Sequence, residues 1–159
     1  MAGKREHHYA VQVEWTGNLG QGTAGYRSYS RDHLVTAGAK PPIAGSSDPA
    51  FRGDPDRWNP EDLLVASLSA CHKLWYLHLC SDAGITVLAY RDGAEGTMAE
   101  GAGGGRFTRV TLRPQVTVKA GDDTARATAL HHEAHRLCFI ANSVNFPVDV
   151  EPVVTISGG

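Results

Sequence analysis

The chain has 159 residues, 42% of them hydrophobic, which is enough for one domain with a real core over residues 1–159. Its formal net charge is -2 at pH 7, so it lacks the basic field that attracts nucleic acid. The N-terminus has no apolar signal-peptide region and no window holds 18 uninterrupted apolar residues, so we expect a cytoplasmic protein without nucleic-acid or membrane partners.

The first third of the chain predicts a β-hairpin followed by a long loop. Residues 8–15 alternate in the manner of a strand, the glycine-containing stretch 17–22 makes a turn, and residues 25–33 are predicted as the partner strand. Residues 36–58 are rich in Pro, Gly, Ser and Asp and show no periodicity. Long loops of this kind more often carry function than act as spacers, so we expect this loop to line a site.

A long helix is predicted from Asn59 to about Gly84. Asn59 is suited to the N-cap and Pro60 to the first helical position, and two acidic residues follow that complement the positive end of the helix. Gly84 is a natural C-terminal cap. Residues 63–80 are apolar on nearly all sides, so we expect the helix to be buried at the centre of its domain or of a dimer.

A second hairpin follows this helix. Residues 85–95 and 106–119 are predicted as its two strands, and the second of them alternates apolar and polar side chains. The glycine-rich run 101–105 joins them as the turn.

A second helix and a closing strand complete the predicted fold. Asp122 or Asp123 is expected to cap a helix with one apolar stripe that ends near Asn142, and residues 148–156 form the last strand. Strands and helices do not alternate regularly, so the predicted class is α+β.

Three cysteines raise the question of redox chemistry. In a cytoplasmic protein an odd number of thiols is reactive, metal-bound or inert, and a lone Cys71 within an apolar helix would be an ordinary core thiol. Cys80 lies about 180° around the same helix from Cys71 and about 13 Å further along it, too far for a disulfide. Cys138 lies on the apolar stripe of the second predicted helix, so a contact with Cys71 is geometrically open.

Two segments of the sequence resemble the OsmC/Ohr family. The run NPEDLLVASLSAC, residues 59–71, is similar to the family's Asn-Pro-Glu opening and buried-helix cysteine, and LCFIANSV, residues 137–144, is similar to its second-helix cysteine segment. The spacing of Glu61, Cys71 and Cys138 and the order of the predicted elements resemble the family layout as well.

The resemblance implies an OsmC-like fold, an intertwined homodimer and a thiol-dependent peroxidase that reduces alkyl or lipid hydroperoxides. Cys71 would attack the peroxide and Cys138 would resolve the sulfenic acid as a disulfide, which a lipoyl-type or small dithiol would reduce. No cofactor and no metal are implied. Phe139 follows Cys138 where many members have proline, a departure that bears on the substrate. Trp75 and the loop residue Phe51 are candidates for the lining of the site.

The resemblance further implies an arginine, paired with Glu61, that stabilises the thiolate and polarises the peroxide. Glu61 and Cys71 lie about 15 Å apart on one straight helix, so the arginine bridges them or the Glu comes from the other subunit. Arg52 resembles the family arginine in position, and we take it as the candidate. The alternatives are Arg57, Arg27 and Arg31.

Other functions predict different roles for the histidines. His131, His132 and His135 could suggest a metal site, but HHEAH is not the HExxH motif, and we expect a solvated helix face. A hydrolase could pair Cys71 with His72, but neighbouring helical residues point about 100° apart. A non-catalytic ligand- or metal-binding OsmC-like protein is the remaining alternative, although it would not need a second thiol.

Overall fold

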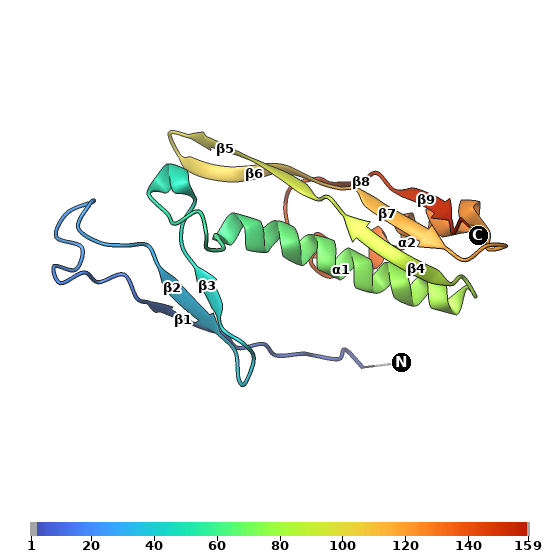
Figure 1. Ribbon diagram of the computed structural model, residues 1–159, viewed down its shortest axis with the longest axis horizontal. Helices are drawn as coiled ribbons and strands as arrows, with labels where there is room; N and C mark the ends of the chain where they lie inside the picture. The colour runs from blue at the N-terminus through green and yellow to red at the C-terminus, as the bar shows by residue number, and fades with distance from the viewer. Residues whose placement is uncertain (1–2, 159) are drawn as a thin grey trace. The chain divides into compact units, whose positions relative to one another are not determined.

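The computed structural model describes residues 3–158, and the chain divides into two units at the boundary between Leu63 and Leu64. The boundary falls in the first turn of helix α1, Pro60–Asp82. Figure 1 shows the elements of both units along the chain. The expectation of a single domain stays a prediction.

The first unit is built on a small antiparallel sheet. Its strands are β1 (Gln12–Trp15), β2 (His33–Thr36) and β3 (Ile43–Gly45), in the order β1-β2-β3. Trp15 stands opposite His33 in the first pair. The second half of the predicted first strand, residues 12–15, is therefore confirmed, but residues 8–11 form no strand and the partner begins at His33, where the predicted strand was expected to end.

Side chains explain why residues 25–32 form no strand. The Arg31 guanidinium donates to the carbonyl oxygens of Tyr26 and Tyr29, both at 2.7 Å, and the Trp15 indole N–H donates to the carbonyl of Ser30 at 2.8 Å. These bonds hold the chain in turns and occupy backbone groups that a strand ladder would need. Alternation in the sequence cannot reveal such competition.

The predicted loop 36–58 contains regular structure. Besides β3 it holds the 3-10 helix η1, Pro49–Phe51, whose N-cap Asp48 accepts a hydrogen bond from the backbone N–H of Ala50. Trp58 returns to the sheet, since its N–H donates to the Ala44 carbonyl at 3.1 Å. The expectation of an unstructured loop is therefore wrong at both places.

The first helix agrees with its prediction at both ends. The Asn59 side chain accepts from the backbone N–H of Asp62 at 2.8 Å, and Gly84 follows the helix with a φ of 73°. Within the single chain the fully buried residues form one stripe at a spacing of four, and Leu74 on another side is 63% exposed, so burial of the remaining sides stays a prediction that depends on the dimer. The buried residues are Leu68, His72, Tyr76 and Cys80.

The second unit contains two mixed three-stranded sheets. One has the order β4-β7-β9 and the other β5-β6-β8, each with one antiparallel and one parallel pair. Figure 1 shows α1 running along these strands. The strands are β4 (Val87–Asp92), β5 (Glu95–Gly101), β6 (Gly104–Leu112), β7 (Pro114–Val118), β8 (Val148–Val150) and β9 (Val153–Ile156).

Three predicted strands are each divided in two. The Asp92 carboxylate at the end of β4 accepts from the Arg113 backbone N–H at 2.7 Å and from the Ser69 hydroxyl, which marks the point where the chain passes between the sheets. Pro152 separates β8 from β9 because proline has no N–H for a ladder. The predicted second hairpin is thus two paired hairpin arms, and the closing strand is two short strands.

The second helix, α2, spans Thr124–Leu137 and is capped by Asp123, whose carboxylate accepts from the Arg126 N–H at 3.0 Å. It ends five residues earlier than expected. Cys138 is its C-cap with extended dihedrals, and a short 3-10 helix, η2 (Ala141–Ser143), follows. Cys138 therefore belongs to the end of the helix and not to its apolar stripe.

Two hydrophobic clusters hold the second unit together. The larger joins α1, α2 and the β4-β7-β9 sheet, and the smaller joins α1 to β6 and β8. No helix between residues 3 and 158 combines the length and hydropathy of a membrane span. Buried members of the larger cluster are Tyr76, Cys80, Ile85, Val116, Val118, Ala127, Leu130 and Ala134, and those of the smaller are Leu68, Val110, Leu112 and Val148.

Candidate active site

The fold brings two of the predicted site residues together. Cys71 lies near the middle of α1 and is partly exposed, whereas Cys138, at the end of α2, is 1% exposed. The two thiols are close enough for Cys71 to affect the pKa of Cys138, and both are free thiols in this structure. Cys80, the third cysteine, is buried further along α1.

The environment of Cys138 keeps its thiol protonated. Burial, with a smaller contribution from the neighbouring Cys71 thiol, raises the pKa of Cys138 to about 11. The backbone N–H groups of Ala141 and Ile140 act in the opposite direction, and that of Ala141 approaches Sγ at 3.5 Å. A neutral Cys138 is a poor nucleophile toward a peroxide, so of the two thiols it is Cys71 that is suited to attack first.

Cys71 opens into an apolar cleft of about 370 Å³. Trp75, which was predicted as lining, packs edge to face on Phe139 with ring centroids 5.4 Å apart. Phe139 and Leu74 were not predicted as lining, and both are large apolar side chains that remain mostly exposed. The lining residues are Cys71, Leu74, Trp75, His78 and Phe139.

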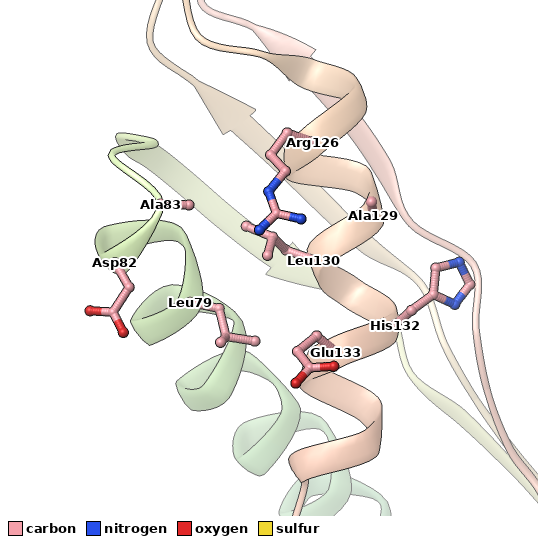
Figure 2. Close-up of a pocket in the computed structure, with 8 residues that line it drawn as sticks. All are labelled: Leu79, Asp82, Ala83, Arg126, Ala129, Leu130, His132 and Glu133. Carbon is pink, nitrogen blue, oxygen red and sulfur yellow. The ribbon is translucent and has the colours of Figure 1, made fainter.

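A larger cleft, of about 580 Å³, lies between the C-terminal part of α1 and α2. Figure 2 shows Arg126 and Glu133 reaching from α2 across a floor that contains Leu130. Its acidic groups already have partners, since Glu133 pairs with Arg136 and Asp82 with His78. No thiol lines it, so the smaller cleft is the candidate active site.

Two of the four candidate arginines are held by structural contacts. Arg57 pairs with Asp32 at 3.4 Å and donates to the carbonyl of His33 at 3.3 Å. Arg31 stacks on Tyr29, 3.9 Å from the ring centroid, and donates to two carbonyls. Their guanidinium groups are committed to the first unit, so neither is suited to activate a thiol.

Arg52 and Glu61, the predicted arginine–glutamate pair, each have a charged group that lacks a partner among residues 3–158. Within residues 3–158 the Arg52 guanidinium makes no ion pair or hydrogen bond, and its nearest aromatic contact is Tyr26 at 5.9 Å. The Oε2 atom of Glu61 is buried and has no hydrogen-bond partner in the same part of the chain. A buried carboxylate oxygen without a partner favours a cation beside it.

The histidines of α2 differ from the expectation of a solvated face. His131 is 1% exposed, and its Nδ1 atom lies 3.0 Å from Nε2 of His72. Its ring also stacks on Tyr76 with centroids 3.7 Å apart. The signal that could have revealed this is position, because His131 is four residues from Ala127 on the buried stripe of the helix.

Burial keeps this histidine pair neutral. It lowers the pKa of His72 to about 4, with a smaller contribution from the charge of His135 and an opposing one from Asp92. It lowers the pKa of His131 to about 3, with contributions from His72 and His132. No three His, Cys, Asp or Glu side chains converge as a metal-binding group in the part of the chain that the structure describes.

Comparison with known proteins agrees with this arrangement. The family model for OsmC-like protein matches residues 53–153, a range that contains Glu61, Cys71 and Cys138. No curated protein sequence matches significantly.

Among solved structures, an OsmC-like protein of unknown function from Vibrio cholerae is 30% identical, covers 93% of this chain and 100% of its own, and has a TM-score of 0.84. An organic hydroperoxide resistance protein from Elizabethkingia anophelis is 20% identical over 98% of this chain and 100% of that one, with a TM-score of 0.66. Its counterpart from Bacillus subtilis is 18% identical over 93% and 98%, with a TM-score of 0.64. With its family model covering most of its length, this chain belongs to the family of OsmC-like proteins.

Proposed function

We propose that this protein is a thiol peroxidase that reduces organic hydroperoxides, with Cys71 as the attacking thiolate and Cys138 as the resolving thiol. The observation that carries the proposal is the proximity of the two thiols, one of which, Cys71, opens into an apolar cleft. The names of two proteins with this fold, both called organic hydroperoxide resistance proteins, support the same chemistry.

The reaction balances with these two thiols and an external reductant. The Cys71 thiolate attacks one peroxide oxygen, the O–O bond breaks, and the other oxygen takes a proton and leaves as an alcohol. Sulfur loses two electrons and becomes a sulfenic acid. The Cys138 thiol then displaces water to form the disulfide, and a lipoyl-type or small dithiol reopens it by two exchange steps.

The cleft favours apolar substrates. Leu74, Trp75 and Phe139 would contact the organic part of an alkyl or lipid hydroperoxide, a gain that hydrogen peroxide cannot make. Phe139, the residue that departs from the family's proline, forms one of these walls. The substrate preference of this chain is therefore expected to depend on Phe139.

Arg52 is proposed to stabilise the thiolate, and Glu61 to orient the guanidinium. The support is chemical, since the guanidinium of Arg52 has no partner among residues 3–158 and Oε2 of Glu61 is buried without one. The homodimer implied by the family is part of the proposal, and the exposed apolar side of α1 around Leu74 supports it.

Replacing Arg52 with glutamine is expected to lower kcat/KM for cumene hydroperoxide about 100-fold, the usual cost of losing one charged donor at a reacting centre. Arg27→Gln is the matched variant, because Arg27 is exposed and also has no ion pair in the described residues. We expect it to keep activity within about twofold of the unmodified protein. Loss of activity in Arg27→Gln alone would move the assignment from Arg52 to Arg27.

Replacing Cys138 with serine is expected to leave the first turnover intact and to stop the second. The Cys71 sulfenic acid would then persist, and dimedone would trap it in close to stoichiometric yield, whereas the unmodified protein gives a Cys71–Cys138 disulfide. Mass spectrometry after one equivalent of cumene hydroperoxide measures both species. A Cys138→Ser protein that turns over repeatedly with a dithiol would contradict the resolving role.

A further inference from the structure

A buried stack of three rings joins the two helices that carry the reactive cysteines. His72 of α1 hydrogen-bonds to His131 of α2 at 3.0 Å, and the two rings are nearly parallel, with an interplanar angle of 7°. Tyr76 of α1 stacks on the His131 ring with centroids 3.7 Å apart, and its hydroxyl donates to the Ala127 carbonyl of α2 at 3.0 Å. We call His72, His131 and Tyr76 the ring stack.

The ring stack places polar side chains in a fully buried part of the protein, which is unusual. All three side chains are essentially fully buried, and two ring nitrogens, Nδ1 of His72 and Nε2 of His131, have no hydrogen-bond partner in residues 3–158. Apolar side chains of the same size would avoid that desolvation cost. Unlike apolar contacts, a hydrogen bond depends on direction. The 3.0 Å bond between His72 and His131 therefore restricts the rotation and the axial position of α1 relative to α2.

The ring stack is also close to the cysteines along both helices. His72 directly follows Cys71 in α1, and neighbouring helical residues point about 100° apart. Fixing His72 against α2 therefore fixes the direction in which Cys71 points. On α2, His131 lies two helical turns before Cys138, so the same contact sets how far the end of that helix reaches along α1.

We propose that the ring stack positions Cys71 against Cys138 for disulfide formation. The inference rests on the proposed function, in which the Cys71 sulfenic acid condenses with the Cys138 thiol and releases water. The three rings touch neither sulfur in this step and act by holding α1 and α2 in one register. Small displacements of reacting atoms are costly, so loss of the contact slows this step rather than the attack on peroxide.

The equilibrium between the Cys71 and Cys138 thiols and their disulfide depends on how the two sulfurs are positioned, and it can be measured without peroxide. In glutathione buffers one glutathione disulfide is reduced to two glutathiones as the Cys71–Cys138 pair loses two electrons and two protons. Acid quenching, alkylation and mass spectrometry give the effective concentration of one thiol toward the other. For His131→Leu we expect a decrease of about tenfold, which corresponds to about 1.4 kcal/mol.

Two further variants separate positioning from general stability. His131→Asn keeps a hydrogen-bonding group at the place of Nδ1 and is expected to recover part of the effect, with a loss of about threefold. His132→Gln changes the exposed neighbour on α2 and is expected to leave the equilibrium unchanged. A residue that stabilises the reduced and oxidised forms equally does not shift this equilibrium, and urea unfolding confirms that each variant is folded.

The outcomes are distinct. Effective concentrations of His131→Leu and His131→Asn within twofold of the unmodified protein would overturn the inference and leave the peroxidase proposal standing. An unmodified protein that forms no Cys71–Cys138 disulfide in any buffer would overturn the proposed function and the inference with it. The expected result is an effective concentration that falls more in His131→Leu than in His131→Asn and stays unchanged in His132→Gln.

Discussion

Replacing Cys71 with serine is expected to abolish peroxide consumption, with a loss of about 10⁴-fold or more in kcat/KM. A serine hydroxyl is not ionised at neutral pH and cannot form a sulfenic acid, so the reaction loses its nucleophile and its first intermediate together. The measurement is the disappearance of cumene hydroperoxide with dihydrolipoamide as the reductant. One equivalent of cumene hydroperoxide should convert the unmodified protein to the Cys71–Cys138 disulfide and should form no disulfide at Cys138 in Cys71→Ser.

The control for this variant is a second cysteine of the same helix. Cys80 is 1% exposed, does not line the cleft, and its pKa is raised by burial. Cys80→Ala is therefore expected to retain turnover, with a moderate loss of stability from the small cavity it creates. Equal peroxide consumption by Cys71→Ser and the unmodified protein would show that another group reduces the substrate.

Acidification is expected to destabilise the protein well above the pH at which its carboxylates titrate. The pKa values of His72 and His131 are about 4 and about 3 in the folded protein, against 6.5 for an ordinary histidine. The unfolded chain therefore binds these protons first. The stability that the neutral pair provides is complete above pH 6.5 and is lost progressively as the pH falls toward the folded values.

Each histidine contributes a slope of about 1.4 kcal/mol per pH unit in this range. Between pH 7.5 and 5.0 we expect the free energy of unfolding in urea to fall by about 2 kcal/mol for one histidine and about 4 kcal/mol for both. Asp92 opposes this fall, and His135 and His132 increase it.

Two variants identify the source of the pH dependence. His131→Leu removes one of the two groups and should reduce the slope by about half, whereas His132→Gln removes only the small contribution of an exposed neighbour and should keep most of the slope. A free energy of unfolding that stays constant between pH 7.5 and 5.0 would show that the pair is already charged in the folded protein.

Local signals account for the parts of the fold that the sequence predicted well. Both ends of α1 were predictable because Asn59 and Gly84 act on the backbone groups next to them, and Asp123 does the same for α2. The strands were less predictable because their limits depend on distant partners. The β4 end, for example, is set by a hydrogen bond between Asp92 and Arg113 that spans 21 residues.

The candidate site shows the same division. Cys71 and Cys138 were identified by residue type and spacing, and the structure places their thiols near each other. Trp75 was predicted as lining, but the place of Phe139 in the cleft wall and the ring stack were not, because Phe139 and His131 owe their roles to the meeting of two helices distant in sequence. Hydropathy alone assigns a histidine to the surface, and only its position on a buried stripe indicates otherwise.

The backbone around Cys138 has a consequence for the catalytic cycle. Cys71 is fixed within a long helix, whereas Cys138 stands where α2 has ended, in an extended conformation and before a single 3-10 turn. We therefore expect the backbone at Cys138, rather than α1 at Cys71, to move when an S–S bond closes. Phe139 is covalently next to Cys138 and walls the cleft, so that movement also displaces the surface on which the alcohol product rests. If Cys71 and Cys138 form the proposed disulfide, we therefore expect the oxidised and reduced protein to present differently shaped clefts, so that departure of the alcohol depends on the oxidation state of the sulfur pair.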